Sequence, residues 1–366
     1  MTNTLIPVIC AVVALVAAAL LTPLAAQLAR RVGAVSQPAG RNIHDVPMPL
    51  LGGLAILAGF LIPVIYYLPL FDTPSKGLIG GAIVVCLIGA LDDIFDLNPA
   101  LKLAGQIGAA VIPVAAGLTI DHITVPFLGA GDLGPAQYPV TILWFVALTN
   151  MINFIDGMDG LAAGVSAIGL TTFAVLAASL GRSVPAIIAA SLAGAAIGFL
   201  RHNFHPARIF MGDAGSLLLG FVVAGVAVSG VMKSAAALAI VLPMIVMAIP
   251  ILDTSFVVLK RLKYGMPVYS ADRSHFHHRF FSIGWGQRRT VLAMYVFCSI
   301  MSAVAIVISF RWGGWIGMTI ASAVAIAAAV YLIYLLEILK WNGTPLVEIV
   351  RRRRGVSTAS TETQPR

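Results

Sequence analysis

Charged residues are scarce in this sequence. Only 10% of its 366 residues are Asp, Glu, Lys or Arg, whereas 59% are hydrophobic and the mean hydropathy is +0.97. A soluble protein of this length needs far more polar surface than such a composition supplies. The shortage of charge therefore excludes an ordinary soluble fold and predicts an integral membrane protein.

Cysteine is also scarce. Cys10, Cys86 and Cys298 each lie within an apolar run, and their spacing matches neither a metal site nor a disulfide framework, so we expect them to have a packing role. The sequence has no lipidation box, internal repeat or low-complexity segment. No small-residue cleavage site follows the first apolar run, so we expect that run to be a retained membrane helix.

What the sequence does contain is a series of long apolar runs. About 20 apolar residues are needed to cross the hydrocarbon core of a membrane, and by that length we predict eleven spans. They cover residues 5–28, 50–70, 77–91, 101–118, 138–152, 161–180, 184–200, 214–231, 235–259, 291–310 and 315–339. The predicted fold is an all-α polytopic membrane protein with about eleven transmembrane helices.

The basic residues are distributed unevenly over the loops between these runs. Cytoplasmic loops carry the excess of Lys and Arg, and an external N-terminus puts 19 of the 23 basic residues on the cytoplasmic side. We therefore predict an external N-terminus and a cytoplasmic C-terminus, with one membrane domain over 1–340 and a basic, disordered tail over 341–366. The net charge of +8 matches an anionic inner leaflet or an anionic substrate and requires no nucleic acid.

Carboxylates gather at the predicted cytoplasmic ends of the apolar runs. Asp92 and Asp93 follow one run, and Asp213 precedes another within FMGDAGS. The segment NMINFIDGMDG contributes Asn153, Asp156 and Asp159. Because Asp156 and Asp159 are three residues apart, we expect a helical turn to put both on one face.

These residue types point to metal-assisted phosphate chemistry. Carboxylate and amide oxygens are hard ligands that suit Mg²⁺, with Mn²⁺ as an alternative, and Mg²⁺ often binds substrate phosphates as well. The loop between Lys260 and Arg289 contains ADRSHFHHR, whose cationic side chains suit phosphate oxygens. These side chains include Arg273, His275, His277 and His278. A metal next to phosphate-binding cations predicts phosphoryl transfer at the cytoplasmic surface.

Each of these features has a simpler explanation that stays open. Asp92 and Asp93 could be a solvated helix end, Asp156 could cap a helix or pair with an arginine, and Asp213 could cap the next helix. The histidine block could bind zinc. A transporter for Mg²⁺ or protons is the alternative from another functional class, because two prolines interrupt the predicted span 235–259 as in transporters.

Five segments resemble the cytoplasmic motifs of a known family. They are RNIHDVPMPLLGG at 41–53, LDDIFDLNPALKLAGQ at 91–106, NMINFIDGMDGLAAG at 150–164, RIFMGDAGS at 208–216 and ADRSHFHHR at 271–279. In this order they are similar to the motifs of the polyprenyl-phosphate N-acetylhexosamine-1-phosphate transferases, in glycosyltransferase family 4. The His-Phe-His-His spacing resembles the branch that uses UDP-N-acetylglucosamine rather than the branch that uses UDP-N-acetylmuramoyl-pentapeptide.

The resemblance implies a reaction, its partners and a location. A UDP-N-acetylhexosamine, here UDP-N-acetylglucosamine, would donate its sugar 1-phosphate to undecaprenyl or another polyprenyl phosphate with Mg²⁺ and release UMP. This would be the first membrane step in cell-envelope glycan biosynthesis. The enzyme would lie in a bacterial cytoplasmic membrane with its site facing the cytoplasm, and a homodimer is a further expectation. The pentapeptide-dependent reaction is the nearest alternative.

The resemblance also implies roles for individual residues. Asp213 would bind Mg²⁺, and Asn153 could supply a further oxygen. Asp92 and Asp93 would bind or deprotonate the lipid phosphate, and Lys102 would hold phosphate. The other implied positions are a catalytic Asp156, Asp159 near the nucleotide base, Phe210 against the uracil, and the substrate-binding residues His44, Arg273, His275, His277 and His278.

Overall fold

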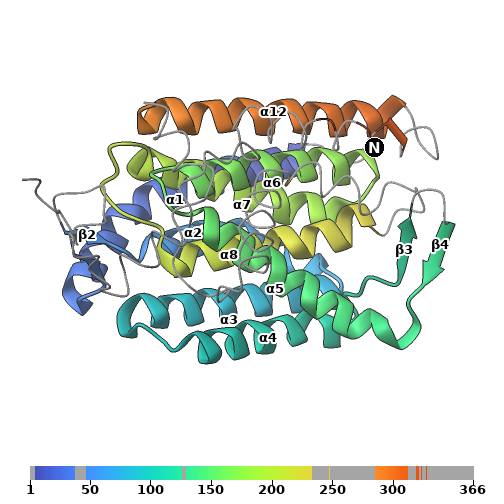
Figure 1. The fold of residues 1–366 in the computed structure, drawn as a ribbon, viewed down its shortest axis with the longest axis horizontal. Helices are drawn as coiled ribbons and strands as arrows, with labels where there is room; N and C mark the ends of the chain where they lie inside the picture. Colours follow the sequence, from blue (N-terminus) through green and yellow to red (C-terminus); the bar gives the residue numbers. More distant parts are fainter. Residues whose placement is uncertain are drawn as a thin grey trace, which may run out of the picture.

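The computed structural model describes residues 5–37, 47–125, 129–232, 247, 285–311, 319–320, 323 and 327. Within them the chain forms a bundle of long helices with two short strand pairs (Figure 1). The helices are α1 (Leu5–Val32), α2 (Gly52–Tyr67), α3 (Thr73–Phe95), α4 (Pro99–Ala115), α5 (Gln137–Ile155), α6 (Leu161–Ser179), α7 (Ser183–Asn203), α8 (Gly212–Val226) and α12 (Gln287–Arg311).

The described helices agree with the predicted spans. Eight helical segments in the described ranges are long and apolar enough to cross a membrane, and α4, with 17 residues, is a shorter apolar helix. Each of the nine helices overlaps a predicted span. The predicted spans 235–259 and 315–339 lie almost entirely outside the described residues. The chain is therefore a helical, multi-pass membrane protein.

The all-α prediction missed two short antiparallel strand pairs. β1 (Val35–Ser36) pairs with β2 (Met48–Pro49) between α1 and α2, and β3 (His122–Val125) pairs with β4 (Gly129–Asp132) between α4 and α5. Figure 1 shows β2 at one end of the bundle and β3 and β4 at the other. Strands of two to four residues are too short for a clear alternation of polar and apolar residues, so periodicity does not predict them.

Helix α8 lies inside the bundle, packed against α2, α3, α5, α6 and α7. Every residue from Ala214 to Val226 is buried, which is why this helix is apolar on all sides. A Cβ on Gly53 of α2 or on Gly89 of α3 would overlap the α8 backbone at 213–215. Small residues let helices approach closely within a membrane, and here they bring the start of α8 against the end of α3.

The alternating direction of the helices collects several termini at one end of the bundle. The end of α3, the start of α4, the end of α5 and the start of α8 are joined there by side-chain hydrogen bonds. The backbone N–H of Phe210, just before α8, donates to the carbonyl of Pro49 in β2 at 2.9 Å. This end, which carries β2, is therefore where the predicted functional residues within the described ranges meet.

Candidate active site

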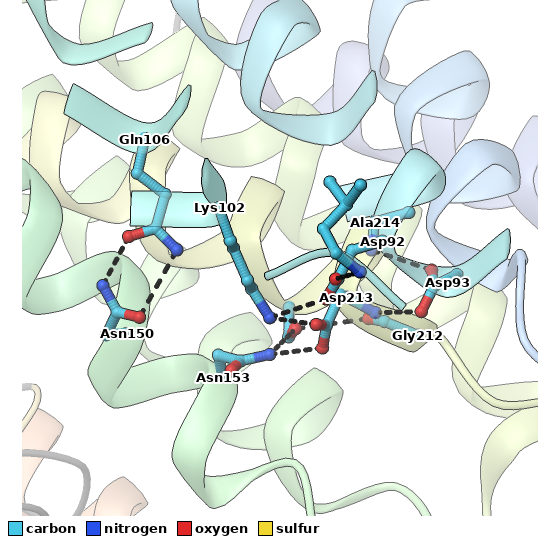
Figure 2. A network of polar contacts seen from close by, with 11 residues as sticks. Asp92, Asp93, Lys102, Gln106, Asn150, Asn153, Gly212, Asp213 and Ala214 are labelled. Atoms are coloured by element: carbon cyan, nitrogen blue, oxygen red, sulfur yellow. Dashed lines mark hydrogen bonds and ion pairs between the residues drawn. The ribbon is translucent and has the colours of Figure 1, made fainter. Parts of the chain in front are cut away.

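A cluster of five charged or amide side chains occupies this end of the bundle (Figure 2). Each comes from a helix terminus: Asp92 and Asp93 from the end of α3, Lys102 from the start of α4, Asn153 from the end of α5 and Asp213 from the start of α8. The structure thus brings together residues up to 121 positions apart in the sequence. Sequence analysis had predicted all five as site residues.

Lys102 is the cation at the centre of the cluster. Its Nζ lies 2.9 Å from Oδ2 of Asp92 and also donates to Oδ2 of Asp213. The three side chains are only 18%, 12% and 27% exposed, respectively. Ion pairs with so little solvent contact are screened less than surface pairs, so Lys102 holds the two carboxylates near one another.

The turn between α3 and α4 positions Asp92. Oδ1 of Asp92 accepts a hydrogen bond from the backbone N–H of Leu97 at 2.8 Å. That bond requires the chain to reverse at Asp96, which ends α3 in the left-handed conformation with φ 51°. Asn98 then caps α4 by accepting from the N–H of Ala100 at 2.8 Å. This local sequence therefore aims Asp92 and Lys102 at each other.

Asp93 has a different role from its neighbour, because it caps α8. Its two carboxylate oxygens accept hydrogen bonds from the backbone N–H groups of Asp213 at 2.8 Å and Ala214 at 3.1 Å. A carboxylate at a helix N-terminus satisfies unpaired donors and complements the helix dipole. Gly212, with φ 68°, leaves room for it, since a Cβ there would overlap the Asp93 carboxylate.

The capping by Asp93 leaves the side chain of Asp213 available for other contacts. Oδ1 of Asp213 accepts a hydrogen bond from Nδ2 of Asn153 at 2.6 Å, and the same Nδ2 donates to Oγ of Ser216 at 2.8 Å. Sequence analysis expected the amide oxygen of Asn153 to face a metal, whereas here its nitrogen faces Asp213. Rotation of the amide would present its oxygen at the same place.

The prediction that Asp156 and Asp159 share a helical turn is wrong. Helix α5 ends at Ile155 and α6 begins at Leu161, so both acids lie in the connecting turn. Gly160 in that turn has φ 78°, a conformation that a helix does not contain. The two carboxylates consequently have different surroundings.

Asp156 is half-buried at the end of α5. Burial raises the pKa of its carboxyl well above the usual range, and the negative charges of Asp213, Asp93 and Asp159 raise it further. The carboxyl group of Asp156 therefore lies close enough to three other carboxylates at this end of the bundle to be repelled by them. A cation bound there would relieve this repulsion.

Asp159 is almost fully buried and links two loops. Its Oδ2 lies 2.9 Å from Nδ1 of His205 and accepts from the N–H of Ala207 at 3.1 Å. The adjacent Gly160 donates its N–H to Oδ1 of Asn203 at 3.0 Å, and its carbonyl accepts from the hydroxyl of Tyr295. These contacts fasten the turn after α5 to the end of α7 and to α12.

The remaining predicted residues fall into two groups. Phe210 is half-buried two residues before the start of α8, and its carbonyl accepts from the N–H of Gly52 at 3.1 Å. The other predicted substrate-binding residues lie outside the described residues; they are His44, Arg273, His275, His277 and His278.

Sequence reasoning missed a pair of amides beside the cluster, Gln106 and Asn150, which hydrogen-bond to each other (Figure 2). It also missed Ser216 and His205. A signal for the amides existed, because Gln106 is four residues after Lys102 and Asn150 is three before Asn153, which places each on the same helix face as its partner. Neither side chain is ionisable, and both were therefore left out of the predicted site.

The donor set at the cluster suits Mg²⁺ better than zinc. In the described part of the chain, no three His, Cys, Asp or Glu side chains converge into a metal cage. Mg²⁺ does not require such a cage, because it commonly uses one or two carboxylates and completes its shell with water and substrate phosphate. Asp213, Asp92 and the amide of Asn153 supply oxygen ligands of that kind.

Known proteins resemble this chain over most of its length. The profile of "Glycosyl transferase family 4" matches residues 76–231. A Bacillus subtilis protein named "Probable undecaprenyl-phosphate N-acetylglucosaminyl 1-phosphate transferase" is 40% identical over 302 residues, covering 82% of this chain and 84% of its own. A decaprenyl-phosphate N-acetylglucosaminephosphotransferase of Mycolicibacterium smegmatis is 34% identical over 340 residues, covering 85% and 84%.

A third relative is more distant but has the same kind of name. The undecaprenyl-phosphate alpha-N-acetylglucosaminyl 1-phosphate transferase of Escherichia coli is 27% identical over 295 residues, covering 78% of this chain and 79% of its own. The matched region of the family profile contains the whole cluster from Asp92 to Asp213. The similarity thus extends over most of the chain and confirms the resemblance noted in its motifs, and the chain belongs to glycosyl transferase family 4.

Proposed function

We infer that this protein is a membrane enzyme that transfers N-acetylglucosamine 1-phosphate from UDP-N-acetylglucosamine to a polyprenyl phosphate and releases UMP. The names of relatives that match about four fifths of the chain support this activity. The observation that carries it in the structure is the cluster formed by Lys102 with Asp92 and Asp213, because it combines a cation for phosphate with oxygen ligands for a metal.

In this reaction the protein forms no covalent bond to the substrates. Its task is to position them and to stabilise the negative charge of their phosphates. An oxygen of the lipid phosphate forms a bond to the β-phosphorus of the UDP-sugar, and the bond from that phosphorus to the bridging oxygen breaks, so UMP leaves. A phosphate monoester has a second pKa of about 6, so the lipid phosphate is largely a dianion at neutral pH. Positioning and electrostatic stabilisation of the spreading negative charge are then the main contributions.

The residues of the cluster have distinct tasks in this proposal. Asp213, with Asn153 and Asp92 beside it, would hold Mg²⁺, which supplies neutralising charge to the diphosphate. Lys102 donates to phosphate oxygens as they enter. Both oxygens of Asp92 already accept hydrogen bonds, from Leu97 and Lys102, which favours a positional role for Asp92 over proton abstraction.

We propose that the site faces the cytoplasm and that the chain crosses the membrane eleven times. The distribution of charge in the described residues supports this orientation. Seven of their Lys and Arg residues lie at the end of the bundle with the cluster, namely Arg30, Arg31, Lys102, Arg201, Arg208, Arg288 and Arg289, and three lie at the other end, namely Lys76, Arg182 and Arg311. Residues 1–340 form the membrane domain in this proposal, and 341–366 form a cytoplasmic tail.

Reporter fusions test the orientation. A reporter joined after Lys340 should be active only as a cytoplasmic fusion, and one inserted at Asp132, in the strand pair β3–β4, only as an external fusion. The excess of basic residues at the end with the cluster is the physical reason. Reversed signals from the two fusions would contradict the cytoplasmic placement of the site.

A donor panel tests the reaction. Purified protein with polyprenyl phosphate and Mg²⁺ should release UMP from UDP-N-acetylglucosamine, and release should require the lipid. The sequence from residue 260 to residue 289 contains no inserted polar segment to receive a peptide stem, so UDP-N-acetylmuramoyl-pentapeptide should be a poor donor. Preference for the pentapeptide donor would assign the chain to the other branch, and UMP release without lipid phosphate would contradict the proposed acceptor.

A further inference from the structure

Gln106 of α4 and Asn150 of α5 form a reciprocal amide pair next to the cluster (Figure 2). Nδ2 of Asn150 donates to Oε1 of Gln106 at 2.6 Å, and Nε2 of Gln106 donates to Oδ1 of Asn150 at 3.3 Å. Nδ2 of Asn150 also donates to the carbonyl of Val146 at 2.8 Å, which fixes the orientation of the amide. The pair thus joins the two helices in one defined arrangement.

The pair lies one helical turn deeper in the bundle than the site residues of the same helices. Gln106 follows Lys102 by four residues on α4, and Asn150 precedes Asn153 by three on α5. Lys102 and Asn153 both donate to Asp213. Any shift of α4 relative to α5 at the amide pair is therefore passed to the two donors that converge on Asp213.

Helix α4 packs mainly on α3, and its contact with α5 is smaller. The residues it buries besides Gln106 are Ala109, Ala110, Pro113 and Val114. Its larger apolar side chains, including Leu101, Leu103 and Ile107, are exposed. Small apolar contacts tolerate sliding, whereas paired amides have one register, so the Gln106–Asn150 hydrogen bonds are a directional contact between α4 and α5.

We propose that Gln106 and Asn150 are positioning residues for the transfer reaction, because their pairing sets the register of α4 on α5 and so the approach of Lys102 and Asn153 to Asp213. Gln106 is 2% exposed and is too deeply buried to contact substrate itself. The inference rests on the proposed function for its kinetic readout. The proposal requires that the two amides act as a pair. The summed length of the two side chains should then matter, and it should not matter which helix carries Gln and which carries Asn.

Exchanging the two side chains tests the proposal. Gln106→Asn shortens the pair by one methylene, Asn150→Gln lengthens it by one, and the exchange variant with both substitutions keeps the sum. Each single variant should lower kcat about tenfold, as expected for a small displacement of groups remote from the chemistry, and change KM for UDP-N-acetylglucosamine little. The exchange variant should recover kcat to within about threefold of the wild type.

A control variant separates positioning from general loss of stability. Thr141 lies on the same helix α5 at the opposite end, where its hydroxyl accepts from the N–H of Ile120 at 2.9 Å. Thr141→Val should lower the Tm without lowering the kcat of the folded enzyme. A kcat loss in Thr141→Val equal to that in Gln106→Asn would mean that any weakening of α5 impairs catalysis, and it would overturn the proposal.

Three other outcomes overturn the proposal: wild-type kcat in both single variants, an exchange variant no better than the worse single variant, or wild-type kcat in a folded Gln106→Met enzyme. Gln106→Met keeps the length and unbranched shape of the side chain. It tests the proposal if the variants with a shortened or lengthened pair fail to fold. Lack of UMP release by the wild type would contradict the proposed function instead. In that case the Tm values still test the contact between the two amides. If Gln106 and Asn150 act as a pair, the single variants have a lowered Tm and the exchange variant regains the Tm of the wild type.

Discussion

Replacing Asp213 by Asn should reduce turnover by roughly three powers of ten while the protein stays folded. Asp213 receives hydrogen bonds from Lys102 and Asn153, and in the proposed reaction it also holds Mg²⁺. Removal of one partner from a poorly solvated ion pair costs about 3–5 kcal/mol, which corresponds to roughly 10²- to 10⁴-fold in rate when the pair serves the transition state. UMP release by purified protein measures the effect.

The fold should tolerate this change because Asp93, and not the Asp213 side chain, caps α8. The backbone N–H groups of Asp213 and Ala214 keep their partners in the Asn variant. Asp132→Asn is the matched control, since Asp132 undergoes the same chemical change at the other end of the bundle, where its side chain is 73% exposed. Turnover above a tenth of the wild-type value in Asp213→Asn would show that Asp213 is not the principal ligand.

Replacing Lys102 by Met should lower turnover by about two to three powers of ten. Lys102 bridges Asp92 and Asp213, so its loss leaves two poorly solvated carboxylates without their shared cation and removes a donor for phosphate. Each charge-assisted hydrogen bond is worth about 1.5–3 kcal/mol, and two such bonds account for the expected loss. The values of kcat and of KM for the lipid phosphate give the measurement.

Two further variants complete the test of Lys102. Lys102→Arg should recover only part of the activity, because the guanidinium keeps the charge but not the compact shape of an ammonium. Lys76→Met removes an exposed lysine from the opposite end of α3 and should leave turnover unchanged. If Lys102→Met retains turnover within threefold of the wild type, the ion pairs of Lys102 are not needed for catalysis and the account of the cluster is wrong.

The sequence predicts the described helices well, for a physical reason. A membrane span requires a long apolar run whatever its neighbours are, so α1, α3 and α7 can be read locally. The acids at the ends of such runs are also visible locally. Five separate motifs predicted a common site. The structure brings Asp92, Lys102 and Asp213, from two of these motifs, into contact, whereas the motif at 271–279 lies outside the described residues.

The separate tasks of Asp92 and Asp93 are harder to obtain from sequence. Neighbouring residues on a helix point about 100° apart, so the two carboxylates leave α3 in different directions. Their actual partners, Lys102 for one and the N-terminus of α8 for the other, depend on the close packing of α3 on α8. Contacts between helices distant in sequence follow from such packing and not from local pattern.

The turn after α5 illustrates the opposite error, because its signal was present and was not used. The repeated Asp-Gly in IDGMDG is typical of turns, and Gly160 does adopt a positive φ. Asp159 consequently lies buried against His205 and Ala207 and not beside Asp156 on a helix. The prediction failed because spacing alone was applied where the helix had already ended.

The most direct measurement of the central claim follows the β-phosphorus of the donor. Purified protein is incubated with Mg²⁺, a polyprenyl phosphate and UDP-N-acetylglucosamine whose β-phosphorus is radioactive, and lipid and aqueous products are separated. Transfer of the sugar with its phosphate predicts that the label enters the lipid fraction while an equal amount of unlabelled UMP appears in water. Label that remains in water as UDP or inorganic phosphate, with or without sugar on the lipid, would contradict the account.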